Sequence, residues 1–340
     1  SNRQSRLTPD GRSLWAFANL YFQPRNPMLY RVVNEHRKDR IAILAVKPEV
    51  LERPDAYVST GNAASAPSEI LPARQGLPAI REMWSVISSE WWNPDDGSKR
   101  KIMAECLVPD VVAPNLIHTV YVPNHQVAER MRSELQGLAV AIVPDPHMFF
   151  QPTWQQRLTH NVSLVDGDMF FSTMQTLTVS VNTVGVMGKG LASRAKYQYP
   201  DVYVVYQDAC RQKTLQMGKP YLYKRESYVD EQLADEPASL PHPNSNKWFL
   251  LFATKESWRE DSDLAGIEQG LKWLQANSSG EGIQSLAVPA LGCGLGGLEW
   301  KDVGPLMCRH LSSLGIPVAI YLPREKQIPR EQLDRGFLLG

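Results

Sequence analysis

The sequence predicts two domains: an α+β domain over 1–145 and a layered α/β domain over 159–340, joined by a linker at 146–158. Three observations support this division. The length of 340 residues accommodates two domains of about 100–200 residues each. The stretch 143–160 carries three prolines and ends where a new strand pattern begins. Beyond it, β-branched runs alternate with helical patterns, which is typical of an α/β domain.

In the first domain, short β-branched runs predict strands and apolar residues at helical spacing predict helices. The expected strands cover 42–46, 56–60, 104–112 and 117–123, and the expected helices cover about 76–90 and 124–136.

In the second domain the alternation is more regular. We expect strands at 161–168, 176–183, 247–254, 285–291 and 317–323, and helices at about 189–199, 201–212, 263–277 and 301–314. The segment 224–247 is polar and contains prolines, so it is expected to be a surface excursion of this second domain.

Composition excludes several classes of protein. Thirty-six basic and thirty-six acidic residues cancel, so overall charge does not favour nucleic-acid binding, although the first forty residues hold eight basic and three acidic side chains. No window approaches 18 consecutive apolar residues, so no membrane contact is expected. We expect a reduced, cytoplasmic setting. Four widely spaced cysteines without a CxxC pair predict neither a metal site nor disulfides: Cys106, Cys210, Cys293 and Cys308.

Two glycine-rich segments of the second domain, 181–190 and 288–300, each follow an expected strand and precede an expected helix. Glycines let backbone N–H groups approach a phosphate closely, and a helix N-terminus favours an anion. Neither segment has the spacing of an NTPase loop or of a dinucleotide-binding fold. Together they predict a ligand with two phosphates held between the two loops.

Several single residues have both a chemical and an ordinary structural interpretation. Lys255, at the end of an apolar strand, is either a solvated lysine or a partly desolvated nucleophile with a lowered pKa. Arg25, between two prolines, is either an ordinary surface arginine or a guanidinium fixed against a phosphate or carboxylate. Glu105, within an apolar strand pattern, is either exposed on the polar face of the strand or placed for chemistry. Trp91 and Trp92 are either core residues or side chains that stack on the bases of single-stranded DNA.

The second domain resembles a macrodomain, most closely the DarG-type antitoxin that removes ADP-ribose from DNA. The segments that carry the resemblance are VDGDMF, VNTVGVMGKGLA, YPDVYVVYQDAC, FATKESWRE and PALGCGLGGLEW, within roughly 160–325. The resemblance implies that Asp168 binds the adenine amino group, that Asn182 faces the distal ribose and that Lys255 performs the hydrolysis. It also implies a diphosphate cradle made by Gly188, Lys189, Gly190, Gly292, Cys293, Gly294, Leu295 and Gly296.

Some related hydrolases have an acidic residue in the second loop, where this chain has Gly296 and Gly297. A catalytic pair of lysine and aspartate is therefore not implied, although Glu299 and Asp302 lie nearby in the sequence.

The first domain resembles the DarT-type toxin, an ADP-ribosyltransferase that moves ADP-ribose from NAD to a base of single-stranded DNA. NLYFQPRNPMLY, VSTGNAAS and KRKIMAECLVPDVV carry this resemblance. It implies that Glu105 is the catalytic glutamate and that Arg25 contacts NAD. The DNA-binding residues would be Trp91, Trp92, Lys99, Arg100 and Lys101.

Two features of the toxin family are expected to be missing from the sequence. In that family, an element with a histidine that grips NAD normally precedes the first of these blocks, whereas the sequence here starts just before the block. Relatives also have a histidine between the TGNAA string and the catalytic glutamate, which assists removal of a proton from the base, whereas no histidine lies between His36 and His118 here.

The two resemblances together imply a toxin–antitoxin fusion with an α+β ADP-ribosyltransferase-like domain followed by an α/β/α macrodomain. The expected substrates and ligands are NAD, ADP-ribose and single-stranded DNA, with no resident cofactor and a monomeric chain. Two alternatives remain open at this stage: only the macrodomain is active and the first domain recruits DNA, or the chain is a non-catalytic reader of ADP-ribose.

Overall fold

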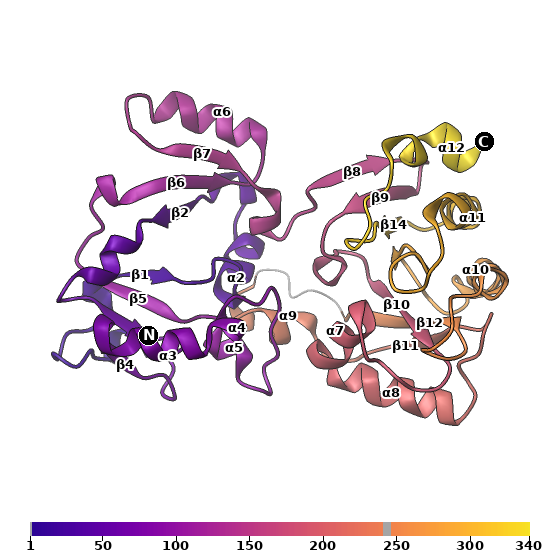
Figure 1. Cartoon of the computed structure of the whole chain (residues 1–340), viewed down its shortest axis with the longest axis horizontal. Helices are drawn as coiled ribbons and strands as arrows, with labels where there is room; N and C mark the ends of the chain where they lie inside the picture. Colours follow the sequence, from indigo (N-terminus) through magenta and orange to yellow (C-terminus); the bar gives the residue numbers. More distant parts are fainter. Residues whose placement is uncertain (1, 241–245) are drawn as a thin grey trace. The chain divides into compact units, whose positions relative to one another are not determined.

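A computed structural model describes residues 2–240 and 246–340, which form two compact units (Figure 1). The first unit comprises Ser1–Gln151 together with Asp230–Pro243, and the second comprises Pro152–Val229 and Asn244–Gly340. The sequence predicts that the segment 224–247 is a surface excursion of the second domain, and this prediction is wrong for residues 230–240, while residues 241–245 lie outside the described residues. The buried residues Leu233 and Ala234 pack within the first unit, which the polar composition around them concealed.

The first unit contains two small sheets, as expected for an α+β domain. One has the strand order β1-β5-β3-β4 and is antiparallel, formed by Phe17–Tyr21, Glu105–Pro109, Tyr57–Ser59 and Ile70–Pro72. The other has the order β2-β6-β7, formed by Ile43–Val46, Ile117–Val122 and Ala141–Pro144. The helices are α1 (Asn2–Ser5), α2 (Pro27–Glu35), α3 (Ala73–Glu82), α4 (Trp84–Ile87), α5 (Ser98–Lys101) and α6 (His125–Glu134).

Local sequence explains where several of these elements begin. Asn26 caps α2 by accepting a hydrogen bond from Leu29 N at 2.9 Å, and Pro27 occupies the first helical turn, where a missing N–H costs nothing. Asn124 caps α6 in the same way. The expected helix at 76–90 is instead two helices, α3 and α4, which meet at Met83.

The second unit has one seven-stranded sheet with the order β11-β12-β10-β13-β14-β9-β8. The five central strands are parallel and the two edge strands are antiparallel. Their bounds are Trp154–Arg157 (β8), Val162–Asp166 (β9), Thr176–Asn182 (β10), Tyr221–Tyr223 (β11), Trp248–Lys255 (β12), Leu286–Pro289 (β13) and Val318–Tyr321 (β14). Part of the expected linker 146–158 is therefore the edge strand β8, which pairs with β9.

Helices cover both faces of this sheet, so the α/β/α layering is confirmed (Figure 1). The helices are α7 (Gly190–Gln198), α8 (Pro200–Arg211), α10 (Leu264–Asn277), α11 (Trp300–Ser312) and α12 (Arg335–Leu339). On β12, Phe252 packs in the core beneath α10 and α11, while Phe249 contacts Tyr199 between α7 and α8. Alternate residues of a strand point to opposite faces, so this one strand contributes to both layers.

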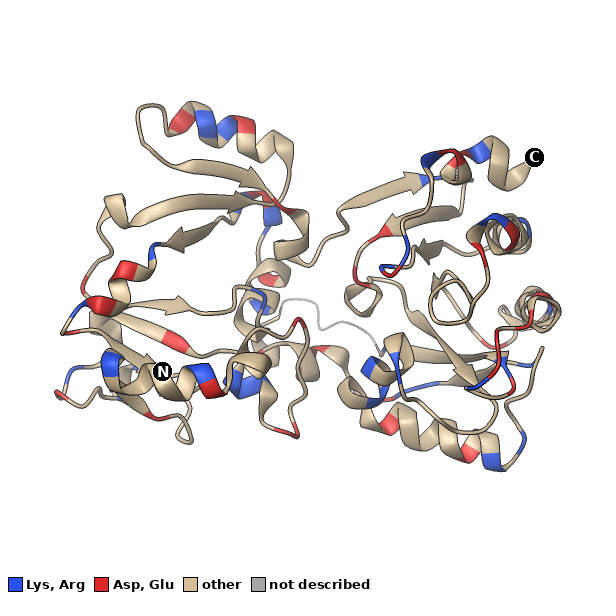
Figure 2. Ribbon diagram, in the orientation of Figure 1, with Lys and Arg blue, Asp and Glu red and all other residues tan. Residues whose placement is uncertain are grey.

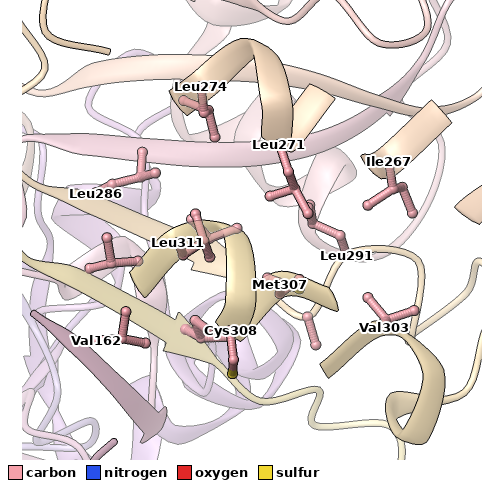
Figure 3. Close-up of a cluster of buried hydrophobic side chains, with 14 of the residues drawn as sticks. Val162, Ile267, Leu271, Leu274, Leu286, Leu291, Val303, Met307, Cys308 and Leu311 are labelled. Atoms are coloured by element: carbon pink, nitrogen blue, oxygen red, sulfur yellow. The ribbon is translucent and has the colours of Figure 1, made fainter. Parts of the chain in front are cut away.

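An extended apolar cluster of the second unit lies under α10 and α11. Figure 3 shows Leu271, Val303, Met307 and Leu311 of these helices beside Val162 and Leu286 of the sheet. This core fixes the carboxyl ends of the parallel strands, where open α/β sheets bind their ligands. No helix among the described residues is long and apolar enough to cross a membrane.

Val303→Ala should lower the free energy of unfolding of the second unit by about 1–3 kcal/mol, because it removes buried methyl groups and leaves a cavity. Val303 is fully buried on α11, whereas Val204 on α8 is 56% exposed. Val204→Ala is therefore the matched control, with an expected change within about 0.5 kcal/mol. Chemical denaturation of the full chain measures both, and equal losses for the two variants would contradict the assigned core.

Candidate functional sites

A cavity of about 800 Å³ opens at the carboxyl ends of the parallel strands in the second unit. The end of β10, the end of β12 and the two glycine-rich loops line it, together with Asp168 and Arg194. Both glycine loops singled out in the sequence therefore border one pocket, as a ligand held between them requires.

The first loop is held in shape by Asn182, the last residue of β10. Its side chain donates to Val186 O at 2.6 Å and accepts from Val184 N at 3.1 Å, while the buried hydroxyl of Tyr206 donates to its Oδ1 at 2.8 Å. Asn182 lines the cavity and orders the loop at the same time. The loop leads into α7, which begins at Gly190 without a side-chain cap, so its first N–H groups remain available to an anion.

The second loop needs glycine because its turns approach one another closely. A Cβ at Gly296 would lie 2.5 Å from Gly292 O and would also meet the Ser262 side chain. Gly292 has a φ of 74°, in the region that side chains rarely adopt. The loop is closed by Leu298 N, which donates to Gly292 O at 3.0 Å.

Of the residues predicted to form the diphosphate cradle, the cavity lining includes Gly188, Lys189, Gly190, Gly292, Gly294, Leu295 and Gly296. Cys293 is not among them. Its side chain is buried in the core, where burial raises the pKa of the thiol to about 12. Only the main chain of Cys293 is therefore suited to contact a ligand.

Asp168 forms a two-pronged ion pair with Arg194 at the wall of the cavity. Arg194 Nη1 lies 2.9 Å from both carboxylate oxygens, and its guanidinium stacks 4.6 Å from the centre of the Phe170 ring. The Nη2 atom of Arg194 is buried and makes no hydrogen bond within the described residues. Asp168 Oδ1 also accepts a hydrogen bond from Phe170 N at 3.1 Å, which fixes the carboxylate further.

Lys255 lies half-buried at the end of β12, directly across the register from Asn182. Its Nζ donates to Glu260 O at 2.8 Å and lies 3.5 Å from Leu295 O, so two main-chain carbonyls hold it at the cavity wall. Glu299, an acidic residue noted near the second loop, pairs with Lys326 at 2.8 Å and does not line the cavity.

Among the lining residues that the sequence analysis did not select are Arg194 and Trp258. Trp258 is 55% exposed at the cavity lining, and the Arg259 guanidinium lies 4.8 Å from its ring centre. Most aromatic side chains in a helical or strand pattern are core residues. The one signal in the sequence that could have pointed to Trp258 is its position three residues after Lys255.

In the first unit, the carboxylate of Glu105 is fully buried at the start of β5. Arg3 donates to Glu105 Oε2 at 3.0 Å and to Oε1 at 2.9 Å, and Ala63 N donates to Oε1 at 2.9 Å. Burial raises the pKa of Glu105, and the Arg3 guanidinium opposes that rise. Arg3 also contacts the Tyr21 hydroxyl at 3.2 Å.

The loop after β3 brings Ala63 to this carboxylate. Arg100 fixes the loop by donating to Thr60 O at 3.2 Å and to the Ser68 hydroxyl at 3.1 Å. A Cβ at Gly61 would lie 2.9 Å from Arg100 O, which explains glycine at that position. The guanidinium of Arg100, predicted to contact DNA, is thus engaged in holding this loop.

Arg25 is buried. Its guanidinium lies 4.9 Å from the centre of the Phe150 ring, and its Nη1 lies 3.8 Å from Glu90 Oε2. Glu90 also faces His147 at 3.1 Å.

The predicted DNA-binding residues differ in exposure. Trp92 is fully buried and its Nε1 donates to Gln232 O at 3.1 Å, while Lys99 Nζ donates to Glu231 O at 2.7 Å. Trp91 and Lys101 are half-buried. The basic run Lys99–Lys101 forms most of α5 (Figure 2).

No group of three or more histidine, cysteine or acidic side chains within residues 2–240 and 246–340 is placed to hold a metal ion.

Comparisons with known proteins add two kinds of similarity. A family model described as ssDNA thymidine ADP-ribosyltransferase, DarT, matches residues 1–150. A Thermosipho africanus protein, named DNA ADP-ribosyl transferase-DNA ADP-ribosyl glycohydrolase fusion protein, is 57% identical over 338 residues, which cover 99% of this chain and 87% of that protein.

The structure of Thermosipho africanus DarTG in complex with ADP-ribose is also similar, with 55% sequence identity and a TM-score of 0.93. The match covers 100% of this chain and 88% of that chain. A DNA ADP-ribosyl glycohydrolase of Thermus aquaticus is 35% identical over 162 residues, which cover 47% of this chain and 41% of that protein.

Gly296→Ala should destabilise the second unit by about 1–3 kcal/mol, because the new Cβ meets the main chain of Gly292, which cannot move aside. Gly315→Ala, where a Cβ meets nothing within 4 Å, should change stability far less. Thermal unfolding of both variants measures the difference. A Gly296→Ala protein as stable as the Gly315→Ala protein would show that the loop is not packed as described.

Proposed function

The chain belongs to the family of DNA ADP-ribosyl transferase–DNA ADP-ribosyl glycohydrolase fusion proteins, and on that basis we propose that its two units catalyse opposing reactions. The first unit transfers ADP-ribose from NAD to a base of single-stranded DNA, and the second removes it. The observation that carries this proposal is the 57% identity to such a fusion protein along 99% of the chain. The family model that matches residues 1–150 supports thymidine as the nucleoside whose base is modified.

In the transferase reaction, the bond between nicotinamide and the ribose anomeric carbon breaks, a bond to the DNA base forms, and the base releases one proton to solvent. Positive charge develops at the anomeric carbon, and a fixed carboxylate stabilises it. Glu105 is suited to this role because its carboxylate is held by the Arg3 side chain and the Ala63 N–H. Arg3 acts as a positioning residue, and Arg25 contacts the NAD phosphates.

In the hydrolase reaction, the cavity of the second unit holds the ADP-ribosyl group. Asp168 accepts a hydrogen bond from the adenine amino group, and Asn182 faces the distal ribose. The two glycine loops donate main-chain N–H groups to the diphosphate. The lining of one cavity by all of these elements supports the assignment.

We propose that Lys255, which lines this cavity, performs the cleavage. Its neutral amine attacks the anomeric carbon, the bond to the base breaks, and the departing base takes up the proton that the alkylated lysine nitrogen loses. Water then attacks the same carbon, releasing ADP-ribose and restoring the lysine. The half-buried position of Nζ, fixed by Glu260 O and near Leu295 O, supports this role.

NAD and ADP-ribose are thus a substrate and a product, and no resident cofactor is needed for either reaction. We propose that the chain acts as a monomer, with one copy of each site.

Lys255→Ala should convert the protein into one that leaves a lasting mark on DNA. Incubated with NAD and oligothymidine, the variant accumulates ADP-ribosylated oligonucleotide, while the wild type removes the mark as it forms. Mass spectrometry of the oligonucleotide measures this. The control is Lys255→Ala combined with Glu105→Gln, which should yield no mark.

Absence of a mark with Lys255→Ala would contradict the transferase assignment. A pre-modified oligonucleotide that the wild type binds and never cleaves would identify a reader of ADP-ribose instead of a hydrolase.

The transferase activity should fall as the pH drops through the pKa of Glu105, because only the ionised carboxylate stabilises the transition state. Since Arg3 lowers that pKa, Arg3→Met should move the acidic limb of the profile to higher pH, by about one to three pH units. Arg3→Lys, which keeps the positive charge, should move it less.

The profile is measured as nicotinamide release in the Lys255→Ala background. Arg12→Met, which removes a surface partner of Asp10, is the control and should leave the limb in place. An Arg3→Met profile that superimposes on that of the control would refute the positioning role of Arg3.

A further inference from the structure

Residues 230–240, which we term the strap, belong to the first unit although they follow β11 of the second unit in the chain. The strap begins within α9 (Val229–Leu233) and continues through a short helical turn at Pro237–Ser239. Asp230, Gln232, Leu233 and Ala234 are buried. The segment is thus packed into the transferase unit along much of its length.

Side chains of α2 hold one side of the strap. The Tyr30 hydroxyl donates to Asp230 Oδ1 at 2.9 Å, in a fully buried hydrogen bond. Arg31 Nε donates to Asp235 Oδ1 at 2.7 Å, and the Ser239 hydroxyl donates to the Glu35 carboxylate. Charged and buried hydrogen bonds of this kind are the stronger ones in proteins, so the strap is specifically bound.

The other side of the strap covers residues that the sequence analysis assigned to DNA. The main chain of Gln232 accepts the Trp92 Nε1 hydrogen bond, and the main chain of Glu231 accepts the Lys99 ammonium. The indole of Trp92, which would have to be accessible to stack on a base, is fully buried, with Phe150 at 6.3 Å between ring centres. A base can therefore stack on Trp92 only if the residues that bury its ring move away.

The strap is negatively charged, as single-stranded DNA is. Its eleven residues include four acidic side chains and no basic one, from Asp230 to Glu236. Asp235 accepts from Arg31 as a phosphate would, and its negative charge also acts on Glu105 and Arg3. The acidic strap therefore lies beside the carboxylate proposed for catalysis.

We propose that the strap masks the face of the transferase unit that binds single-stranded DNA, so that DNA must displace residues 230–240 to reach Trp92 and Lys99. The inference rests on the proposed transferase function. It couples the two halves of the chain, because a segment within the hydrolase sequence restrains the transferase.

Asp230→Asn combined with Asp235→Asn should loosen the strap and raise the affinity for a short fluorescent oligothymidine by about tenfold, measured by anisotropy in the Lys255→Ala background. A tenfold change corresponds to about 1.4 kcal/mol, less than the two buried or charged hydrogen bonds supply. The matched control is Glu231→Gln with Glu236→Gln. It removes the same number of charges from two exposed side chains, and only the main chain of Glu231 is used in the contact with Lys99.

Hydrogen exchange of the unaltered strap gives a second readout that does not depend on how a variant folds. The Ala234 N–H donates to Asp230 O at 2.8 Å and should be protected in the free protein. Adding oligothymidine should speed exchange of the strap amides.

Unchanged protection together with equal affinities of the two double variants would overturn the inference, even if the Lys255→Ala protein marks DNA as expected. A protein that neither binds nor marks oligothymidine in any variant would overturn both the inference and the proposed transferase function.

Discussion

The two-pronged ion pair between Arg3 and Glu105 is the interaction on which the site of the first unit depends. A carboxylate with no exposed surface is costly unless charge and hydrogen bonds compensate for the water it has lost. Arg3 supplies both, and the Ala63 N–H adds a third hydrogen bond. Arg100 holds the loop after β3 in a conformation in which the Ala63 N–H reaches this carboxylate.

The second unit also contains a largely buried carboxylate that a guanidinium stabilises. Asp168 is nearly buried at the wall of the cavity and is held by the guanidinium of Arg194. In both units a guanidinium therefore fixes a carboxylate that is proposed to face part of the ADP-ribosyl group. The difference is access: Asp168 lines an open cavity, whereas Glu105 is enclosed by Arg3 and lies near the strap. This contrast is consistent with a hydrolase site that is ready for its ligand and a transferase site that is restrained.

Local patterns explain what the sequence could predict. The strand–helix alternation of the second unit and its two glycine loops are set by neighbouring residues, so the central parallel strands, their helices and one border of the cavity were predictable. The pairing of Arg3 with Glu105 joins residues 102 positions apart and has no local signature. The strap was misassigned for a similar reason, because Asp230 appears solvent-exposed in the sequence and is buried against a partner 200 positions away, Tyr30.

The central claim is that one chain both writes and erases ADP-ribose on DNA, and the products of the unaltered protein test it most directly. Nicotinamide and free ADP-ribose should be quantified together after incubation with NAD, with and without oligothymidine. The account predicts equal amounts of both products, formed only when DNA is present, while the oligonucleotide remains unmodified at the end. Release of both products at the same rate without DNA, or nicotinamide release without free ADP-ribose or marked DNA, would contradict it.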